Sequence, residues 1–303
     1  MDIFLTGASG YIGGTVAARL IAAGHRVRGL VRSAEKADAV RRLGIDPVLG
    51  TLDDAVLLAR EAGRADAAIN AADSDHRGAA EALAGALAGT NKVLLHTSGS
   101  SIVADTAAGE ASDRVYDESI YDPGSAWTPT PDKAARVAID RLILSAKGVR
   151  AIVLCPCLIY GRGLGADPES LQLPLLVQYA RKTGIARHVG NGRNIWSTVH
   201  IEDVADAYLL ALAKAPPGSF LFVENGEASF RDMVGAIARA LRLGPAEAWP
   251  IEDAIRELGY SRAMFSQGSN SRVRARRTRA LGWTPRHDSV VAWIETAFQP
   301  TPA

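Results

Sequence analysis

The chain has few cysteines and no long apolar run, and each shortage excludes a class of protein. Only Cys155 and Cys157 are present, on either side of Pro156; they are too few for a disulfide framework and lack the neighbouring ligands of a zinc site. No apolar run approaches the roughly 18 residues of a membrane span, and no cleavable signal peptide precedes the first apolar run. We therefore expect two buried thiols in a soluble, cytoplasmic protein.

An excess of charge of one sign is also missing. The 34 basic and 33 acidic residues leave a net charge of +1, so no overall field attracts nucleic acid or a membrane surface. One dense basic cluster, which we define as the arginines of residues 272–279, lacks interleaved aromatic side chains and is predicted to be a solvated helix face. We expect a small-molecule substrate, and neither nucleic acid nor a membrane as partner.

The first fourteen residues organise the rest of the chain. Ile3–Leu5 has the pattern of a buried strand, and Gly7, Gly10 and Gly13 follow before an alanine-rich helical segment. This order suits a dinucleotide: the glycines allow a tight turn, close approach of the pyrophosphate and helix packing, and the positive helix end attracts the phosphates. A second strand at Arg26–Val31 completes a βαβ unit. We predict nucleotide binding; the alternative is a glycine turn without a ligand.

The end of the second predicted strand indicates which dinucleotide is bound. In this arrangement an acidic residue favours the free ribose hydroxyl of NAD, whereas arginine accommodates the 2′-phosphate of NADP. Arg32 stands there and Lys36 lies close enough to assist, although both could be ordinary surface charges. We predict NADP, with NAD as the alternative.

Two later strand ends add polar and small residues. The runs 66–72 and 92–96 predict two further strands, and the first of them ends in Ala71 and Ala72, whose small side chains leave room for a cofactor. The second ends in the hydroxyl cluster 97–101, at the edge where ligands bind in open α/β sheets. These hydroxyls are predicted to contact substrate; the alternative is that they only satisfy the backbone of a turn.

The spacing of residues 6–13, Thr-Gly-x-x-Gly-x-x-Gly, resembles the short-chain dehydrogenase/reductase superfamily, and in particular its extended branch of nucleotide-sugar epimerases, dehydratases and reductases. The segment 156–161 resembles the proline element that covers the nicotinamide in that branch, and 281–285, Leu-Gly-Trp-Thr-Pro, resembles its terminal element. The resemblance implies a Rossmann-type doubly wound parallel sheet with a small C-terminal substrate lobe. It divides the chain into a cofactor-binding core, 1–165 completed by 196–224, and an interleaved lobe, 166–195 and 225–303.

The catalytic pair of that superfamily is absent. No tyrosine in the chain is followed four residues later by lysine, the arrangement in which lysine lowers the tyrosine pKa for proton exchange with substrate. If Lys133 is the family lysine, Pro129 replaces the tyrosine; if Asp140 fixes the register, Arg136 replaces the lysine and Asp132 the tyrosine. Some atypical reductases work with a lysine alone, which makes Lys133 a candidate. The other candidate proton donors are Tyr116, Tyr121, Tyr160 and a bound water.

The resemblance, carried over residue by residue, gives the expected site. The cofactor-binding residues are Gly7, Ser9, Gly10, Tyr11, Ile12, Gly13, Arg32, Leu52, Ala71, Ala72, Thr97 and Pro156. The catalytic residues are Ser98, Ser100 and Lys133, and no metal-binding set is predicted. Arg193, Trp196 and His200 could border the substrate pocket, with a structural role favoured for His200.

These observations predict an NADP-preferring oxidoreductase of the atypical extended type, which moves hydride between nicotinamide and a carbonyl or alcohol carbon. The nearest enzymatic alternative is a nucleotide-sugar epimerase or dehydratase, against which the missing tyrosine argues. A non-catalytic regulatory protein that senses NADP is the alternative from another class. The resemblance also implies a homodimer formed through the helices that follow the fourth and fifth strands.

Overall fold

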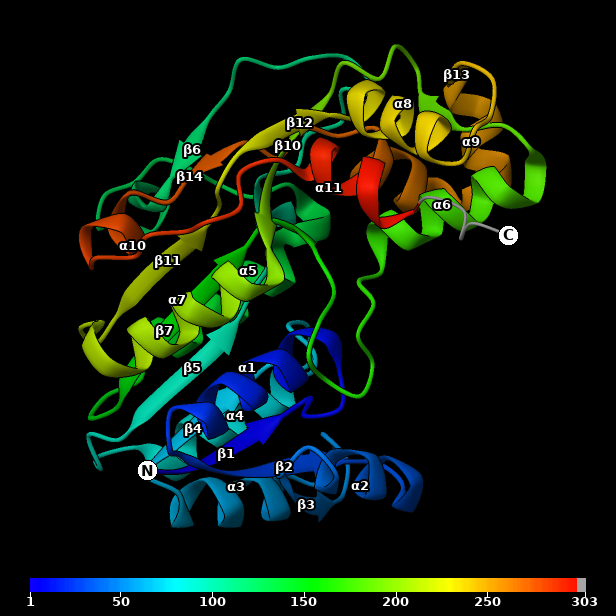
Figure 1. The fold of residues 1–303 in the computed structure, drawn as a ribbon. Coiled ribbons are helices and arrows are strands. Elements are labelled where there is room, and N and C mark those ends of the chain that lie inside the picture. Colours follow the sequence, from blue (N-terminus) through cyan, green and yellow to red (C-terminus); the bar gives the residue numbers. More distant parts are fainter. Residues whose placement is uncertain (299–303) are drawn as a thin grey trace.

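A computed structural model describes residues 1–298 and contains a seven-stranded sheet (Figure 1). All its neighbouring strands pair in parallel, in the order β11-β7-β5-β4-β1-β2-β3. The order reverses beside β1, which is the switch point of a doubly wound sheet. The predicted Rossmann-type α/β fold is therefore confirmed. The strands are β1 (Asp2–Thr6), β2 (Arg26–Val31), β3 (Asp46–Leu49), β4 (Ala67–Asn70), β5 (Val93–Thr97), β7 (Arg150–Pro156) and β11 (Ser219–Val223).

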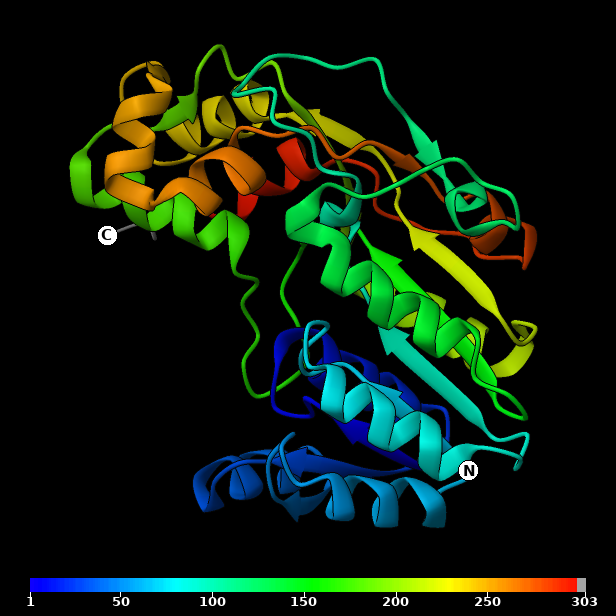
Figure 2. The same ribbon diagram turned by 180° about the vertical axis from the view of Figure 1, so that it is seen from behind.

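Helices cover both faces of this sheet. On one face α1 packs against α7, and on the other α3, α4 and α5 lie side by side, as the two opposite views show (Figures 1 and 2). α2 packs against β2 and β3. The helices are α1 (Tyr11–Ala22), α2 (Ala34–Arg41), α3 (Ala55–Arg64), α4 (Arg77–Leu87), α5 (Ala134–Leu144) and α7 (Ile201–Lys214).

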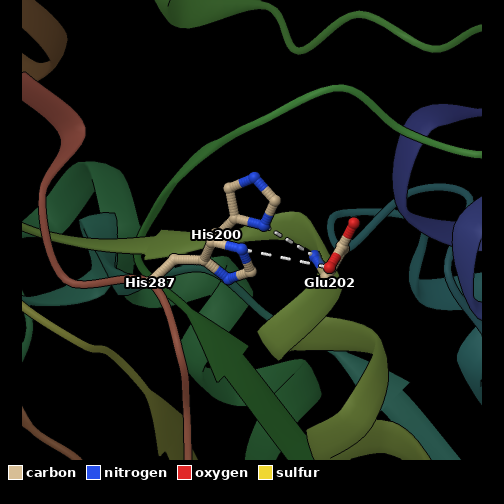
Figure 3. A group of neighbouring side chains, drawn as sticks. All are labelled: His200, Glu202 and His287. Atoms are coloured by element: carbon tan, nitrogen blue, oxygen red, sulfur yellow. Dashed lines mark hydrogen bonds and ion pairs between the residues drawn. The ribbon is translucent and has the colours of Figure 1, made fainter. Parts of the chain in front are cut away.

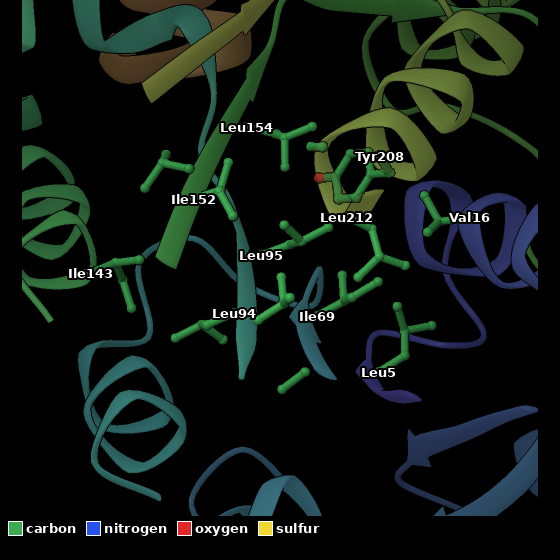
Figure 4. Close-up of a cluster of buried hydrophobic side chains, with 14 of the residues drawn as sticks. Leu5, Val16, Ile69, Leu94, Leu95, Ile143, Ile152, Leu154, Tyr208 and Leu212 are labelled. Carbon is green, nitrogen blue, oxygen red and sulfur yellow. The ribbon is translucent and has the colours of Figure 1, made fainter. Parts of the chain in front are cut away.

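The large core lies between the sheet and these helices because successive side chains of a strand point to opposite faces. Leu95 of β5 projects toward Tyr208 and Leu212 of α7, whereas its neighbour Leu94 projects toward Ile143 of α5 (Figure 4). The one polar atom of Tyr208, its hydroxyl, lies 2.6 Å from Thr97 Oγ1, so the buried phenol has a hydrogen-bond partner. The core thus holds the carboxyl ends of β4 and β5 in place under the site.

A smaller set of elements packs beyond the carboxyl ends of the strands, in the upper part of Figure 1. β10 pairs with β8 and β12, and β9 pairs with β13. The strands are β8 (Leu158–Tyr160), β9 (Arg187–Val189), β10 (Ile195–His200), β12 (Glu227–Ser229) and β13 (Glu247–Trp249). The helices are α6 (Gln172–Thr183), α8 (Phe230–Ala240), α9 (Ile251–Leu258) and α11 (Val290–Ala297). A second cluster of buried apolar side chains joins α6, α8 and α11. The expected boundaries between the core and the lobe remain a prediction.

Two local patterns differ from the structure. The run Gly-Asn-Gly-Arg-Asn at 190–194 has the composition of a hairpin turn, but β9 and β10 on either side of it pair with other strands. The basic cluster is not one solvated helix face: Arg272 and Arg274 lie on extended chain and both pair with Glu227, and only α10 (Arg276–Ala280) is helical. Acidic residues distant in sequence neutralise these arginines, which a local pattern does not reveal.

The remaining elements are short. β6 (Tyr116–Asp117) pairs with β14 (Val273–Arg274), and the chain also forms η1 (Ser100–Val103), η2 (Glu118–Tyr121), η3 (Pro131–Lys133) and η4 (Arg262–Gln267).

The expectation for the cysteines is met. Cys155 and Cys157 are buried free thiols, and burial raises the pKa of each well above its usual value. Within residues 1–298, no helix has both the length and the apolar character to cross a bilayer.

Candidate cofactor and substrate site

Close packing explains why glycine occupies the turn after β1. Gly7 has φ +75°, and a Cβ there would lie 2.6 Å from the carbonyl oxygen of Ala71. A Cβ on Gly13 would lie 2.3 Å from the carbonyl oxygen of Gly7. Both obstacles are backbone atoms, which cannot rotate away as a side chain would. The turn therefore holds α1 against the ends of β1 and β4, as a dinucleotide fingerprint requires.

The N-terminus of α1 is open to an anion. Gly10 is the N-cap, no side chain caps the helix, and its first turn contains no acidic residue. The free backbone N–H groups and the positive end of the helix dipole then face the space beside Ser9 and Gly10. This arrangement suits a pyrophosphate.

A cavity of about 600 Å³, which we call the first cavity, lies beside this helix end. It contains most of the residues expected at the adenosine and pyrophosphate. Its lining is Gly7, Ser9, Gly10, Leu30, Val31, Arg32, Thr51, Leu52, Asp53, Ala71, Ala72, Asp73, His76 and Asp167. Gly13 lies beneath the turn and does not line the cavity, which agrees with a packing role for the third glycine.

Arg32 is the basic side chain of the first cavity that remains available. It is exposed, and within residues 1–298 its guanidinium makes no hydrogen bond or ion pair with another residue. Lys36, expected to assist, instead forms an ion pair with Asp167, with 2.7 Å between Nζ and Oδ1. Asp53 Oδ1 lies 3.1 Å from His76 Nε2, and the neighbouring Asp54 is the N-cap of α3.

The second cavity, of about 550 Å³, continues from the first because both are lined by Gly10, Ala71, Ala72 and Asp73. Besides the shared Gly10, Ala71 and Ala72, it brings together six further predicted site residues from three parts of the chain: Tyr11, Ile12, Thr97, Ser98, Ser100 and Pro156. It also contains residues that no motif indicated, among them Glu169, Ser170 and Gln172, together with Ser101 of the hydroxyl cluster and Arg136. Of the three residues proposed to border the substrate, Trp196 lines it, whereas Arg193 and His200 do not.

The loop 161–171 forms one wall of the two cavities. It descends from β8 to α1 in Figure 1, where the backbone N–H of Asp167 donates to the Ser9 carbonyl at 3.0 Å. The Tyr11 hydroxyl donates to the Gly161 carbonyl at 2.8 Å, and burial raises the pKa of Tyr11. Tyr11 is therefore a fixed wall of the cavity that keeps its proton at neutral pH.

The two predicted serines are anchored differently. Ser98 Oγ donates to Asp140 Oδ2 at 2.8 Å, so it stands between the second cavity and a buried acid. Ser100 Oγ accepts a hydrogen bond of 3.0 Å from the Ser271 hydroxyl. Both serines are buried, yet both line the second cavity, where a substrate oxygen could reach them.

Lys133 does not line the second cavity. It lies in an adjoining cavity of about 650 Å³, with its Nζ 2.8 Å from Asp132 Oδ2 and 5.3 Å from the centre of the Phe265 ring. The residue that faces the second cavity is Arg136, whose Nη1 donates to Ser101 Oγ at 3.0 Å. This placement corresponds to the register in which Arg136 replaces the family lysine.

His200, Glu202 and His287 form a separate group whose possible ligand atoms lie within 4.8 Å of one another (Figure 3). Each of the three side chains already contacts another residue of the protein. His200 Nδ1 accepts the backbone N–H of Glu202 at 3.3 Å, and its Nε2 lies 2.3 Å from where a Gly161 Cβ would be. Arg286 Nη2 lies 3.5 Å from the Glu202 carboxylate. The geometry favours a structural role, joining the C-terminal segment to α7.

Solved structures with the same fold include nucleotide-sugar enzymes. A dTDP-glucose 4,6-dehydratase from Bacillus anthracis, solved in complex with NAD, superposes with a TM-score of 0.74 at 17% identity, over 98% of this chain and 95% of the other. A UDP-glucose 4-epimerase from Thermotoga maritima superposes with a TM-score of 0.74 at 15% identity, over 97% and 96%. At these identities the likeness concerns the fold.

Sequence comparisons identify the family. An oxidase from an Acremonium species is 32% identical over 335 residues, covering 98% of this chain and 96% of its own. A 4-hydroxy-2-methyl-3-oxo-4-farnesyl-3,4-dihydroquinoline-1-oxide ketoreductase from Stigmatella aurantiaca is 33% identical over 241 residues, covering 75% and 69%. The model of the NAD-dependent epimerase/dehydratase family matches residues 3–221. The chain therefore belongs to the NAD-dependent epimerase/dehydratase family.

Proposed function

We propose that this protein is an NADP-preferring oxidoreductase of the atypical extended type, acting on a carbonyl or alcohol carbon. The observation that carries the proposal is the continuity of the two cavities: the open end of α1 lies beside the first, and Ser98 and Ser100 line the second. Relatives named as an oxidase and a ketoreductase support redox chemistry on a small molecule.

The residues of both cavities fit a nicotinamide dinucleotide. The glycine turn and the uncapped end of α1 would hold the pyrophosphate, and Arg32 would pair with the 2′-phosphate. When bound, the nicotinamide supplies or accepts the hydride. Ser98 and Ser100 would orient the substrate oxygen, and Lys133 would act from the adjoining cavity on the part of the substrate that reaches it.

Replacing Arg32 with alanine is expected to weaken NADPH binding about tenfold or more and to leave NADH binding within about twofold. The reason is that a guanidinium–phosphate pair contributes charge-assisted hydrogen bonds only when the phosphate is present. Fluorescence titration of wild type and variant with both cofactors measures this. Arg42→Ala, an exposed change on the same part of the chain but outside the cavity lining, is the control. Equal affinity of wild type for the two cofactors contradicts the NADP preference.

The missing tyrosine–lysine pair favours the alternative of a non-catalytic NADP sensor. Measuring turnover of NADPH distinguishes such a sensor from an enzyme. An oxidoreductase consumes NADPH when a suitable carbonyl compound is added, whereas a sensor binds NADPH without consuming it. A nucleotide-sugar epimerase or dehydratase would show no net change of cofactor. A panel of carbonyl compounds and nucleotide sugars, followed by NADPH absorbance and product analysis, separates the three functions.

Several finer expectations belong to this proposal. They are the cytoplasmic location, the division into core and lobe, and a homodimer formed through α4 and α5, which lie together on the face shown in Figure 2. Light scattering of the purified protein tests the dimer.

A further inference from the structure

A buried acid lies directly beneath Ser98. Asp140 of α5 is fully buried, and its Oδ2 accepts hydrogen bonds from Ser98 Oγ at 2.8 Å and from the Tyr121 hydroxyl at 2.7 Å. Its other oxygen, Oδ1, has no hydrogen-bond partner within residues 1–298. His96 Nε2 lies 3.8 Å from Oδ1 and is also without a hydrogen-bond partner in that part of the chain.

The hydrogen bonds behind His96 determine which of its nitrogens carries the proton. Thr6 Oγ1 accepts the N–H of Ala71 at 3.2 Å and donates its own proton to Asn70 Oδ1 at 2.7 Å. The amide nitrogen of Asn70 therefore faces His96 Nδ1, at 3.1 Å, and donates to it. Because burial lowers the pKa of His96 to about 4, the ring is neutral near pH 7 with its proton on Nε2. That nitrogen lies 3.8 Å from Asp140 Oδ1.

The surroundings of Asp140 allow its carboxyl group to gain and lose a proton near neutral pH. Burial raises its pKa to about 6, and the hydrogen bonds from Tyr121 and Ser98 oppose this rise. Titratable and charged groups face Asp140 from several elements. They are Arg136 on its own helix, His96 on β5, Cys155 on β7, Tyr121 on η2 and Asp75 before α4. Burial keeps the Tyr121 hydroxyl and the Cys155 thiol protonated, so the proton that exchanges is the one on Asp140.

We propose that Asp140 supplies the proton of carbonyl reduction, and accepts it in alcohol oxidation, through the Ser98 hydroxyl. Ser98 is the group that touches substrate, and Asp140 acts only through it. His96, held by Asn70 and Thr6, positions the system by directing its Nε2–H at the carboxylate that remains. This inference rests on the proposed function, and it provides a proton path that does not need the missing tyrosine.

The step balances as follows. Hydride from NADPH adds to the carbonyl carbon, and the C–O π electron pair moves to oxygen. Ser98 Oγ–H gives its proton to that oxygen, while the O–H of protonated Asp140 gives its proton to Ser98 Oγ. The products are the alcohol, NADP⁺ and the Asp140 carboxylate, which then regains a proton from solvent. In the oxidation direction each transfer reverses, so the carboxylate form of Asp140 is the active one.

The first test needs neither cofactor nor substrate. Infrared difference spectra of the protein alone, recorded against pH, are expected to contain a carboxylic acid C=O band that titrates near pH 6 in wild type and is absent from Asp140→Asn. Asp38→Asn, an exposed aspartate on α2, is the matched control and retains the band. If no band depends on Asp140, or if it titrates at the ordinary aspartate pKa of about 4, the proposal is wrong.

The second test is the pH profile of NADPH-dependent carbonyl reduction. In wild type kcat is expected to be constant below about pH 6 and to fall as pH rises, because the protonated acid is consumed. Asp140→Asn and Ser98→Ala are each expected to lower kcat at pH 6 at least tenfold, and Asp140→Asn to remove the break, with NADPH affinity within about twofold of wild type. A break that persists in Asp140→Asn overturns the proposal.

Tyr121→Phe keeps the proposal testable if Asp140→Asn does not fold. The Tyr121 hydroxyl lowers the pKa of Asp140, so its removal is expected to raise that pKa and to move both the infrared titration and the kinetic break to higher pH. An unchanged break contradicts the inference. A wild type that reduces none of the carbonyl compounds contradicts the proposed function instead, and the infrared titration still decides whether Asp140 holds the proton.

Discussion

Replacing Gly13 with valine is expected to abolish measurable binding of NADPH and NADH. The new Cβ would lie 2.3 Å from the carbonyl oxygen of Gly7, a distance that no relaxed pair of these atoms adopts. Because the obstacle is backbone, α1 would have to move away from the turn. The N–H groups at the open end of the helix would then no longer face the position of the pyrophosphate. Fluorescence titration with each cofactor measures the loss.

The matched control is Gly63→Val. Gly63 lies near the end of α3 and is exposed, and a Cβ at this position would meet no atom beyond its own helix within 4 Å. Its replacement introduces the same side chain into a helix, so any general effect of valine on helix stability appears there as well. Circular dichroism of both variants verifies that the sheet and helices have formed. Affinity of Gly13→Val within a few fold of the control contradicts the assignment of the turn.

The glycine turn could be predicted because its chemistry is local. Gly7, Gly10 and Gly13 act within one strand–turn–helix unit, and Arg32 follows from the end of the next strand. The doubly wound sheet was predicted from the family resemblance, which rests on motifs that are equally local. The helix α1 was also visible in the sequence, as the alanine-rich segment after the glycines.

The proton path could not be predicted, since its members come from separate strands and a helix. His96 and Ser98 lie on or after β5 and Asp140 lies on α5, and the sequence indicated Asp140 only as a marker of register. Lys133 shows the same difficulty. It ends the short η3 helix, where its side chain turns to Phe265 in the adjoining cavity, and nothing in the spacing of the segment indicates this turn.

The role of Asp203 also depends on distant residues. Asp203 lies in the first turn of α7, where the helix dipole favours an acid, but its carboxylate binds the C-terminal segment. Oδ1 accepts the backbone N–H of Arg286 at 2.9 Å, and Oδ2 accepts that of His287 at 3.0 Å. The Trp283 indole N–H donates to the Asp203 carbonyl at 3.0 Å, so two kinds of contact join this segment to the helix.

Asp203→Ala is expected to lower the free energy of unfolding by about 3 kcal/mol. Asp203 is fully buried, and its removal leaves the two backbone N–H groups without an acceptor, each costing about 1–3 kcal/mol. Urea denaturation followed by circular dichroism measures the change, because the denaturant midpoint falls while the slope stays constant for a pure loss of stability.

Asp206→Ala is the matched control for this change, one turn further along α7. Asp206 forms ion pairs with Arg19 and Arg286, but its side chain is 32% exposed, so solvent screens these pairs and their loss is expected to cost less than about 1 kcal/mol. Equal effects of the two changes would mean that the C-terminal segment gains no special stability from the Asp203 carboxylate. A much larger effect at Asp203 would show that this one side chain holds residues 283–287 on α7, and with them the structural pair of His287 and His200.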